Sequence, residues 1–181
     1  MRSLLFLLLF FPLISLSQDS LNMSLLGEYN YPNFLGNDIW GYVDSSGNEY
    51  AIVGLREGVS FVDVTDPTTP NEIFFIPDVY SIWRDIKTWN NYAYVTTESD
   101  TGLLIIDLND MSGNTYYHKT VFNNPNGSNV EFTAAHNIYI DENGIAYIFG
   151  ASSNTSSYPS NGAIFLDLTT GLAQGISMIA I

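Results

Sequence analysis

The sequence contains no cysteine, and this absence excludes several kinds of chemistry. Without thiols the chain can form no disulfide bond, no thiolate metal site and no cysteine nucleophile, and it has no cysteine that could carry a lipid anchor. The stability of its fold must therefore come from packing and hydrogen bonding.

The chain also has little positive charge, with 5 Lys and Arg residues against 19 Asp and Glu residues among 181 positions. The formal net charge of −14 repels a phosphate backbone, so we expect no nucleic-acid partner. Such a surface favours solubility and would also suit cations. Apolar residues make up 46% of the sequence, which predicts one folded domain with a real core.

A single long apolar run stands at the N-terminus. Leu4 to Leu16 follow the positive charge of Arg2, and the small residues Ser15 and Ser17 mark a cleavage site. The run is short for a membrane-spanning helix, and the pattern predicts a secretory signal peptide over residues 1–17. The mature chain is therefore predicted to be secreted, extracellular or held at the cell surface, and export without cysteine favours a bacterial setting.

Three later segments, starting at Asn37, Trp83 and Ala135, resemble one another. Each has an alanine inside one apolar run and an aspartate that closes the next. These anchors are Ala51, Ala93 and Ala146, and Asp63, Asp107 and Asp167. They recur at intervals of roughly 40 to 60 residues, and a period near this length with several short strands is typical of a β-propeller blade.

The segments are rich in Val, Ile, Tyr and Phe and are bounded by turn-forming residues, which predicts an all-β fold of four-stranded antiparallel blades. The predicted strands are Asp38–Val43, Tyr50–Leu55, Val59–Val64 and Asn71–Ile76; Arg84–Trp89, Tyr92–Thr97, Leu103–Leu108 and Thr115–Phe122; and His136–Ile140, Ile145–Gly150 and Ala163–Leu168. Residues 169–181 suggest only the start of one more strand.

The predicted organisation is a lead-in over residues 18–36 followed by a partial β-propeller over residues 37–181. Its blades cover about 37–77, 81–122 and 134–181. Propellers use about four to eight blades, so three cannot close a ring. We therefore expect the N-terminal part of a longer protein, whose remaining blades would be partners of these three. Assembly from several copies is the alternative.

Two polar residues precede the isoleucine that opens each innermost strand. The pairs are Asn37-Asp38, Arg84-Asp85 and His136-Asn137. In a propeller this position lies near the mouth of the central channel, which makes a set of ligand-binding candidates. They are Asp38, Trp83, Arg84, Asp85, His136 and Asn137. Asp38, Asp85 and His136 are also candidate ligands for Ca²⁺ or Mg²⁺, although no cofactor is required. The alternative is structural, with these residues pairing among themselves and satisfying backbone groups.

The other notable side chains favour structural roles. Asp63, Asp107 and Asp167 can accept hydrogen bonds from the turns that follow them. His118 is predicted to lie on the surface of an outer strand. The three tryptophans, Trp40, Trp83 and Trp89, suit core or blade packing, and the first two could instead line a sugar or aromatic site.

No catalytic motif stands out: there is no Gly-x-Ser-x-Gly, no His-Glu-x-x-His and no phosphate-binding loop. The many carboxylates leave a glycosidase open, but nothing selects one pair. We therefore do not predict an enzyme.

Three stretches carry a family resemblance: "VGLREGVSFVDVTDPTTP", "SIWRDIKTWNNYAYVTTE" and "AAHNIYID". Over about Leu26 to Leu168 the chain resembles the choice-of-anchor B family, exported proteins built from LVIVD-type repeats. The resemblance implies a β-propeller that is released or held at the cell surface, and it names no catalytic residue.

Together these observations predict a secreted or cell-surface, non-enzymatic module that binds an extracellular protein or glycan. One alternative is a metal-dependent or hydrolase-like propeller enzyme that uses the channel mouth. Another is a truncated fragment without a function of its own.

Overall fold

The computed structural model describes residues 23–123, 129–153, 163–169 and 174–175. These residues are all-β, with strands that form three four-stranded antiparallel sheets and one two-stranded hairpin. No helix in these ranges has the length and apolar character that a membrane crossing needs. The predicted signal peptide, residues 1–17, lies outside the described residues.

Each four-stranded sheet is one blade, and its strands follow the order of the chain. Blade 1 consists of β1 (Gly36–Val43), β2 (Glu49–Leu55), β3 (Gly58–Asp63) and β4 (Asn71–Pro77). Blade 2 consists of β5 (Arg84–Trp89), β6 (Tyr92–Thr97), β7 (Leu103–Asp107) and β8 (Tyr116–Lys119). Blade 3 consists of β11 (Asn137–Ile140), β12 (Ile145–Phe149), β13 (Ala163–Asp167) and β14 (Gln174–Gly175).

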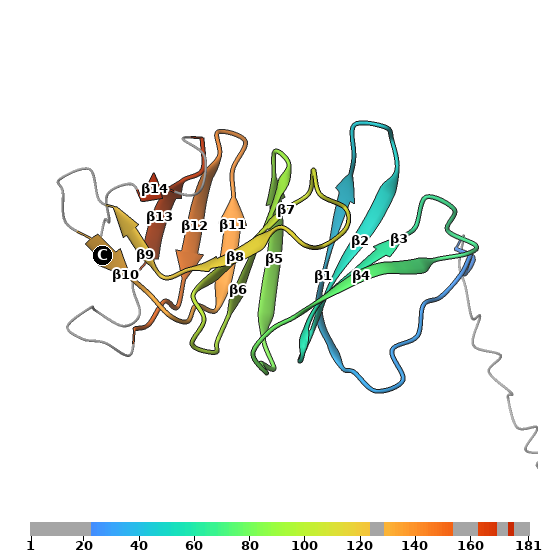
Figure 1. Ribbon diagram of the computed structural model, residues 1–181, viewed down its shortest axis with the longest axis horizontal. Helices are drawn as coiled ribbons and strands as arrows, with labels where there is room; N and C mark the ends of the chain where they lie inside the picture. Colours follow the sequence, from blue (N-terminus) through green and yellow to red (C-terminus); the bar gives the residue numbers. More distant parts are fainter. Residues whose placement is uncertain (1–22, 124–128, 154–162, 170–173, 176–181) are drawn as a thin grey trace, which may run out of the picture.

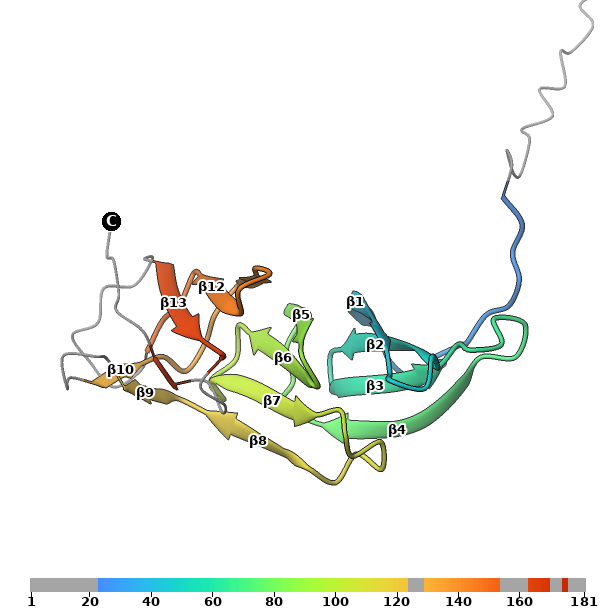
Figure 2. The same cartoon turned by 90° about the horizontal axis from the view of Figure 1, so that it is seen from above.

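The blades stand side by side, with the first strands β1, β5 and β11 next to one another in a row (Figure 1). Seen from above, β4 and β8 run along the opposite edge of the array (Figure 2). The described residues do not close a ring. The prediction of an all-β protein built from propeller-like blades, about three in number, is thus confirmed.

The prediction of one continuous outer strand over Thr115–Phe122 is wrong. The chain divides there into β8 and a separate strand, β9 (Val121–Asn123), which pairs with β10 (Asn129–Glu131). The hairpin forms because Phe122 and its partner strand supply apolar side chains that the space between blades 2 and 3 can bury. Blade 3 also has a fourth strand, since β14 pairs with Leu166 and Asp167 of β13.

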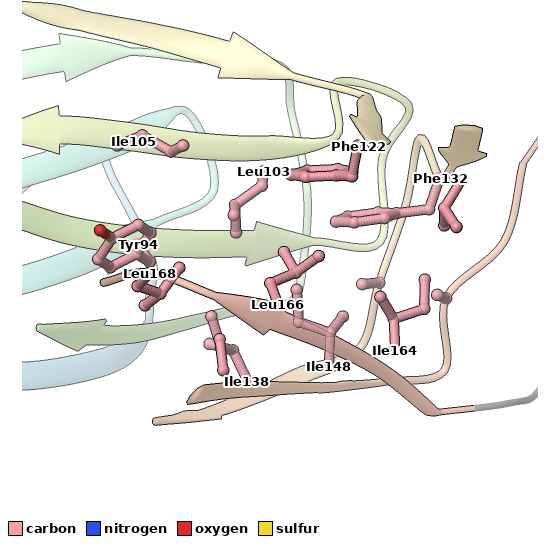
Figure 3. Close-up of a cluster of buried hydrophobic side chains, with 14 residues drawn as sticks. Tyr94, Leu103, Ile105, Phe122, Phe132, Ile138, Ile148, Ile164, Leu166 and Leu168 are labelled. Carbon is pink, nitrogen blue, oxygen red and sulfur yellow. The ribbon is translucent and has the colours of Figure 1, made fainter. Parts of the chain in front are cut away.

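Two hydrophobic clusters fill the spaces between blades. Between blades 1 and 2, buried Ile, Val, Leu and Phe side chains include Ile52, Phe61, Ile76, Ile86, Val95 and Leu104. Between blades 2 and 3, the cluster includes Tyr94, Ile105, Ile138, Ile148 and Leu166 together with Phe122 and Phe132 of the hairpin region (Figure 3). Blade 2 lies between the two clusters, which explains why "LLII" in β7 is apolar at successive positions.

Turns of one blade also rest on side chains of the blade before it. Gly144, in the turn between β11 and β12, has a φ of +78°, and a Cβ atom there would lie 2.4 Å from the ring of Trp89. Only glycine combines this backbone conformation with so close an approach. Trp89 therefore serves as a platform for the first turn of blade 3.

Candidate functional site

The six candidate residues lie at one end of the row of first strands. Asp38 lies on β1, Arg84 and Asp85 open β5, and Asn137 opens β11. Trp83 and His136 come directly before β5 and β11. The structure thus brings the repeated polar positions to adjacent strands, although their side chains have different surroundings.

Asp38 and Asp85 each accept a hydrogen bond from the backbone of the next blade. Asp38 Oδ2 accepts from Ile86 N–H at 2.7 Å, and Asp85 Oδ2 accepts from Ile138 N–H at 2.9 Å. Asp85 Oδ2 also accepts from Asn137 Nδ2 at 3.2 Å. Because β5 and β11 are edge strands of their sheets, these carboxylates supply partners that no strand provides.

The electrostatic surroundings of the two carboxylates differ. Burial raises the pKa of the Asp38 carboxyl above its ordinary value, and the hydrogen bond from Ile86 N–H offsets only part of this effect. Asp85 instead forms an ion pair with Lys87. Both carboxylates are thus engaged by groups of the chain itself.

Arg84 lies inside the protein, and its side chain is 0% exposed. Its guanidinium pairs with Asp78 Oδ2 at 2.5 Å and donates to the carbonyl oxygen of Leu55 at 2.8 Å. His118 Nε2, on β8, lies 3.0 Å from the other oxygen of Asp78. These three ionisable side chains tie the connection between blades 1 and 2 to both blades.

The pKa of Asp78 reflects the balance in this network. Burial acts to raise it, but the hydrogen bond from His118 and the charge of Arg84 outweigh burial, so the pKa of Asp78 is below its ordinary value. The carboxylate is therefore held ionised inside the protein.

A different arrangement surrounds His136. His136 Nδ1 lies 2.5 Å from Glu98 Oε1, and both side chains are about half exposed. The Trp83 ring, also half exposed, meets the imidazole edge-on with 6.5 Å between ring centroids. Gly150 has a φ of +65°, and a Cβ atom there would lie 2.8 Å from that of His136, so glycine leaves room for the histidine.

A polar cavity of about 320 Å³ adjoins this group. It is lined by Glu98, Ala134, Ala135, Gly150, Ala151 and Ser152. We call Trp83, Glu98, His136 and this cavity the rim site. Glu98 was missed by the sequence reasoning because it directly follows β6 at a position that carries Arg56 in blade 1 and Ala151 in blade 3. Its only signal was an acidic residue at the end of a repeated strand.

Among the described residues, no group of three or more His, Cys, Asp or Glu side chains lies close enough to hold a metal ion. The metal-ligand candidates face separate partners: Asp38 faces Ile86, Asp85 faces Ile138 and His136 faces Glu98. Binding of Ca²⁺ or Mg²⁺ stays a prediction.

The aspartates that close the third strands share one contact. Each accepts a hydrogen bond at 2.8–2.9 Å from a backbone N–H two residues later. The donors are Thr65 for Asp63, Asn109 for Asp107 and Thr169 for Asp167. Such bonds hold the turn that begins at each strand end.

Two stretches of the chain match the model of the LVIVD repeat, residues 42–76 and residues 83–115. The chain carries LVIVD repeats. The first repeat runs from the end of β1 to β4, and the second runs from Trp83 to the residue before β8. Each matched stretch therefore covers most of one blade. Comparison with curated proteins gives no match.

Proposed function

We propose that the chain is a non-enzymatic binding module that holds a glycan at the rim site. The observation that carries this proposal is an exposed indole, Trp83, beside the exposed pair of His136 and Glu98. A sugar ring offers an apolar face to an aromatic ring and hydroxyl groups to polar side chains. The adjoining cavity of about 320 Å³ has the volume of a small-ligand pocket.

We further propose that the module works outside the cell, released or held at the cell surface. Two features support this: the signal-peptide pattern of residues 1–17 and the resemblance of the sequence to the exported choice-of-anchor B family. The LVIVD repeats are of the type from which that family is built. The net charge of −14 favours the solubility of a released chain.

The proposal is tested by screening the purified chain on a glycan array and then measuring affinity by calorimetry for the best glycan. Trp83→Ala should weaken binding at least tenfold, because it removes the stacking platform. The matched control is Tyr116→Ala, which removes an exposed aromatic side chain from β8, and it should leave the affinity unchanged. Equal affinities of the wild type and Trp83→Ala would contradict the proposal.

The same titration tests the metal-dependent alternative. Repeating it with a chelator should leave glycan affinity unchanged if Glu98 and His136 act only as hydrogen-bonding groups. Loss of binding with chelator, restored by Ca²⁺, would instead indicate that an ion completes the site.

A further inference from the structure

We call the face that blades 1 and 2 turn toward the following blade the front face, and the face that blades 2 and 3 turn toward the preceding blade the rear face. The equivalent faces of blades 3 and 1 carry the same names. At the centre of the front face stand equivalent residues of the second and third strands: Ile52 and Phe61 in blade 1, Tyr94 and Ile105 in blade 2, and Tyr147 and Phe165 in blade 3. The residues of blades 1 and 2 are at most 1% exposed because the following blade covers them. Those of blade 3 are only partly buried.

The front face of blade 3 carries a ladder of aromatic rings across three strands. Tyr139 pairs with Tyr147 and Tyr147 pairs with Phe165 in the sheet register, with ring centroids 5.9 Å and 5.2 Å apart. Tyr139 is 57% exposed, and Phe149 on the same face is also exposed. Exposed apolar groups gathered on one face mark an interaction surface.

The two junctions inside the chain show what such a face binds. In both, the partner is a rear face with an Ile, an Ala, and further aliphatic residues on its first three strands. Blade 2 presents Ile86, Ala93, Val95 and Ile106, and blade 3 presents Ile138, Ala146, Ile148 and Leu166. Front faces therefore bind aliphatic rear faces, not other front faces.

Blade 1 presents the same pattern on its rear face. The equivalent residues are Ile39, Ala51, Val53 and Val62, and they line a cavity of about 360 Å³. Ile39 is 63% exposed, whereas its counterparts Ile86 and Ile138 are buried. The N-terminal segment covers the outer part of this face, where Tyr31 donates a hydrogen bond to Ser60, and leaves Ile39 accessible.

We propose that the front face of blade 3 binds the rear face of blade 1 in a second copy of the chain. Asn137 stands in the position of Asp38 and Asp85, so its amide oxygen is offered to the backbone N–H of Ile39 of the second copy. Contacts at both ends join two copies head to tail. The six blades described in two copies fall within the range of about four to eight found in closed propellers, and a ring closed in this way has two-fold symmetry.

The charge of the chain sets a condition on this association. Each copy carries a formal net charge of −14, and two such chains repel one another. Salt screens this repulsion over about 10 Å at 0.1 M and over shorter distances at higher concentration. Association driven by apolar faces should therefore strengthen with salt, opposite to association driven by ion pairs.

The test is sedimentation velocity on the chain over a concentration series at low and high salt. The wild type should form dimers, and more of them at high salt. Ile39→Asp and Tyr139→Asp each place a charge on one of the two faces, and each should sediment as a monomer. Mixed in equal amounts, the two variants should form dimers again, because one intact face of each remains. Tyr116→Asp, on β8, is the control and should dimerise like the wild type.

A wild type that stays monomeric at all concentrations and salts would overturn the proposal. A mixture that stays monomeric while the wild type dimerises would also overturn it. That result would indicate that each face binds the same face of another copy, and mixing the two variants cannot restore a contact of that kind. Melting curves check that the variants fold. Val43→Asp and Phe149→Asp, at other exposed positions of the same two faces, replace any variant that does not fold.

Discussion

The two junctions between the described blades share one polar contact and an aliphatic core, and they differ in how the connecting chain is held. In both, an aspartate on the first strand of one blade accepts a hydrogen bond from an isoleucine N–H near the start of the first strand of the next blade. The junction between blades 1 and 2 adds the buried ion pair of Arg84 and Asp78, which the partly exposed His118 also contacts. The junction between blades 2 and 3 adds a hairpin with stacked rings of Phe122 and Phe132, 5.0 Å apart.

The comparison of the two junctions indicates which part of the repeat sets the geometry between blades. The aspartate fixes the position of the next first strand, since it is common to both junctions. The connecting segment is held differently in each junction, because its length and sequence vary. Ionic contacts hold it in the first junction and stacked aromatic rings in the second. The two junctions should therefore respond differently to mutation and to pH.

The largest effect is expected at the ionic junction. Arg84→Ala leaves the Asp78 carboxylate buried without its cation, and removing one partner of a buried pair costs about 3–5 kcal/mol. Urea unfolding measures this loss in the free energy of unfolding. Arg56→Ala, which removes a hydrogen bond to the Tyr80 hydroxyl near the surface, should cost far less. Equal costs for the two variants would show that the network does not hold the junction.

The shared contact should have similar weight in both junctions. Asp38→Ala and Asp85→Ala each leave the N–H of an isoleucine without its acceptor, which costs about 1–3 kcal/mol. Asp38→Asn and Asp85→Asn keep an acceptor oxygen and should recover much of that loss. If one alanine variant is as stable as the wild type in urea while the other is not, the aspartate does not have the same role in the two junctions.

The dependence of stability on pH should separate two of the aspartates. The pKa of Asp78 is lowered in the folded state, so its contribution is present above its unfolded pKa of about 3.9 and is lost as pH falls below it. The pKa of Asp38 is raised, so its contribution falls as pH rises above about 3.9. The free energy of unfolding, measured in urea, should therefore rise less between acid and neutral pH in Asp78→Asn than in the wild type. In Asp38→Asn it should rise more than in the wild type.

The smallest effect is expected at the surface of the first junction. Trp40 Nε1 donates to Thr88 Oγ1 at 3.0 Å, and Lys87 Nζ lies 4.4 Å from the centre of the indole. Trp40→Phe keeps a ring under the lysine and removes the hydrogen bond, which should cost about 0.5–1.5 kcal/mol. A larger loss in the free energy of unfolding would mean that the indole also contributes to the packing of this junction.

Much of the fold was predictable because the repeated elements are local. The alternation of β-forming runs and turn residues located β5 and β6 at their observed bounds, and the aligned isoleucines placed Asp38 and Asp85 in equivalent positions. The hairpin of β9 and β10 was not predictable from the repeat, because Phe122 is drawn away from β8 by a packing space that only the assembled blades create.

The candidate site was predictable only in part, for a related reason. The repeat predicted that Asp85 and His136 lie at the same end of adjacent first strands. It could not predict which of the side chains at these positions is buried. Arg84 is buried against Asp78, a residue of the connecting segment, and His136 faces Glu98, a residue outside the repeated pattern. Contacts with residues that do not repeat are invisible to an argument from repeats.

Hydrogen exchange at the Ile86 and Ile138 amides reports on the contacts that hold the blades in register, in which a carboxylate accepts from the first strand of the next blade. The Ile86 and Ile138 amides should exchange slowly in the isotope-labelled wild type, although they lie on edge strands. In Asp85→Ala the Ile138 amide should lose its protection while Ile86 keeps it, and Asp38→Ala should show the reverse. Fast exchange of both amides in the wild type, or protection that neither substitution changes, would contradict the account.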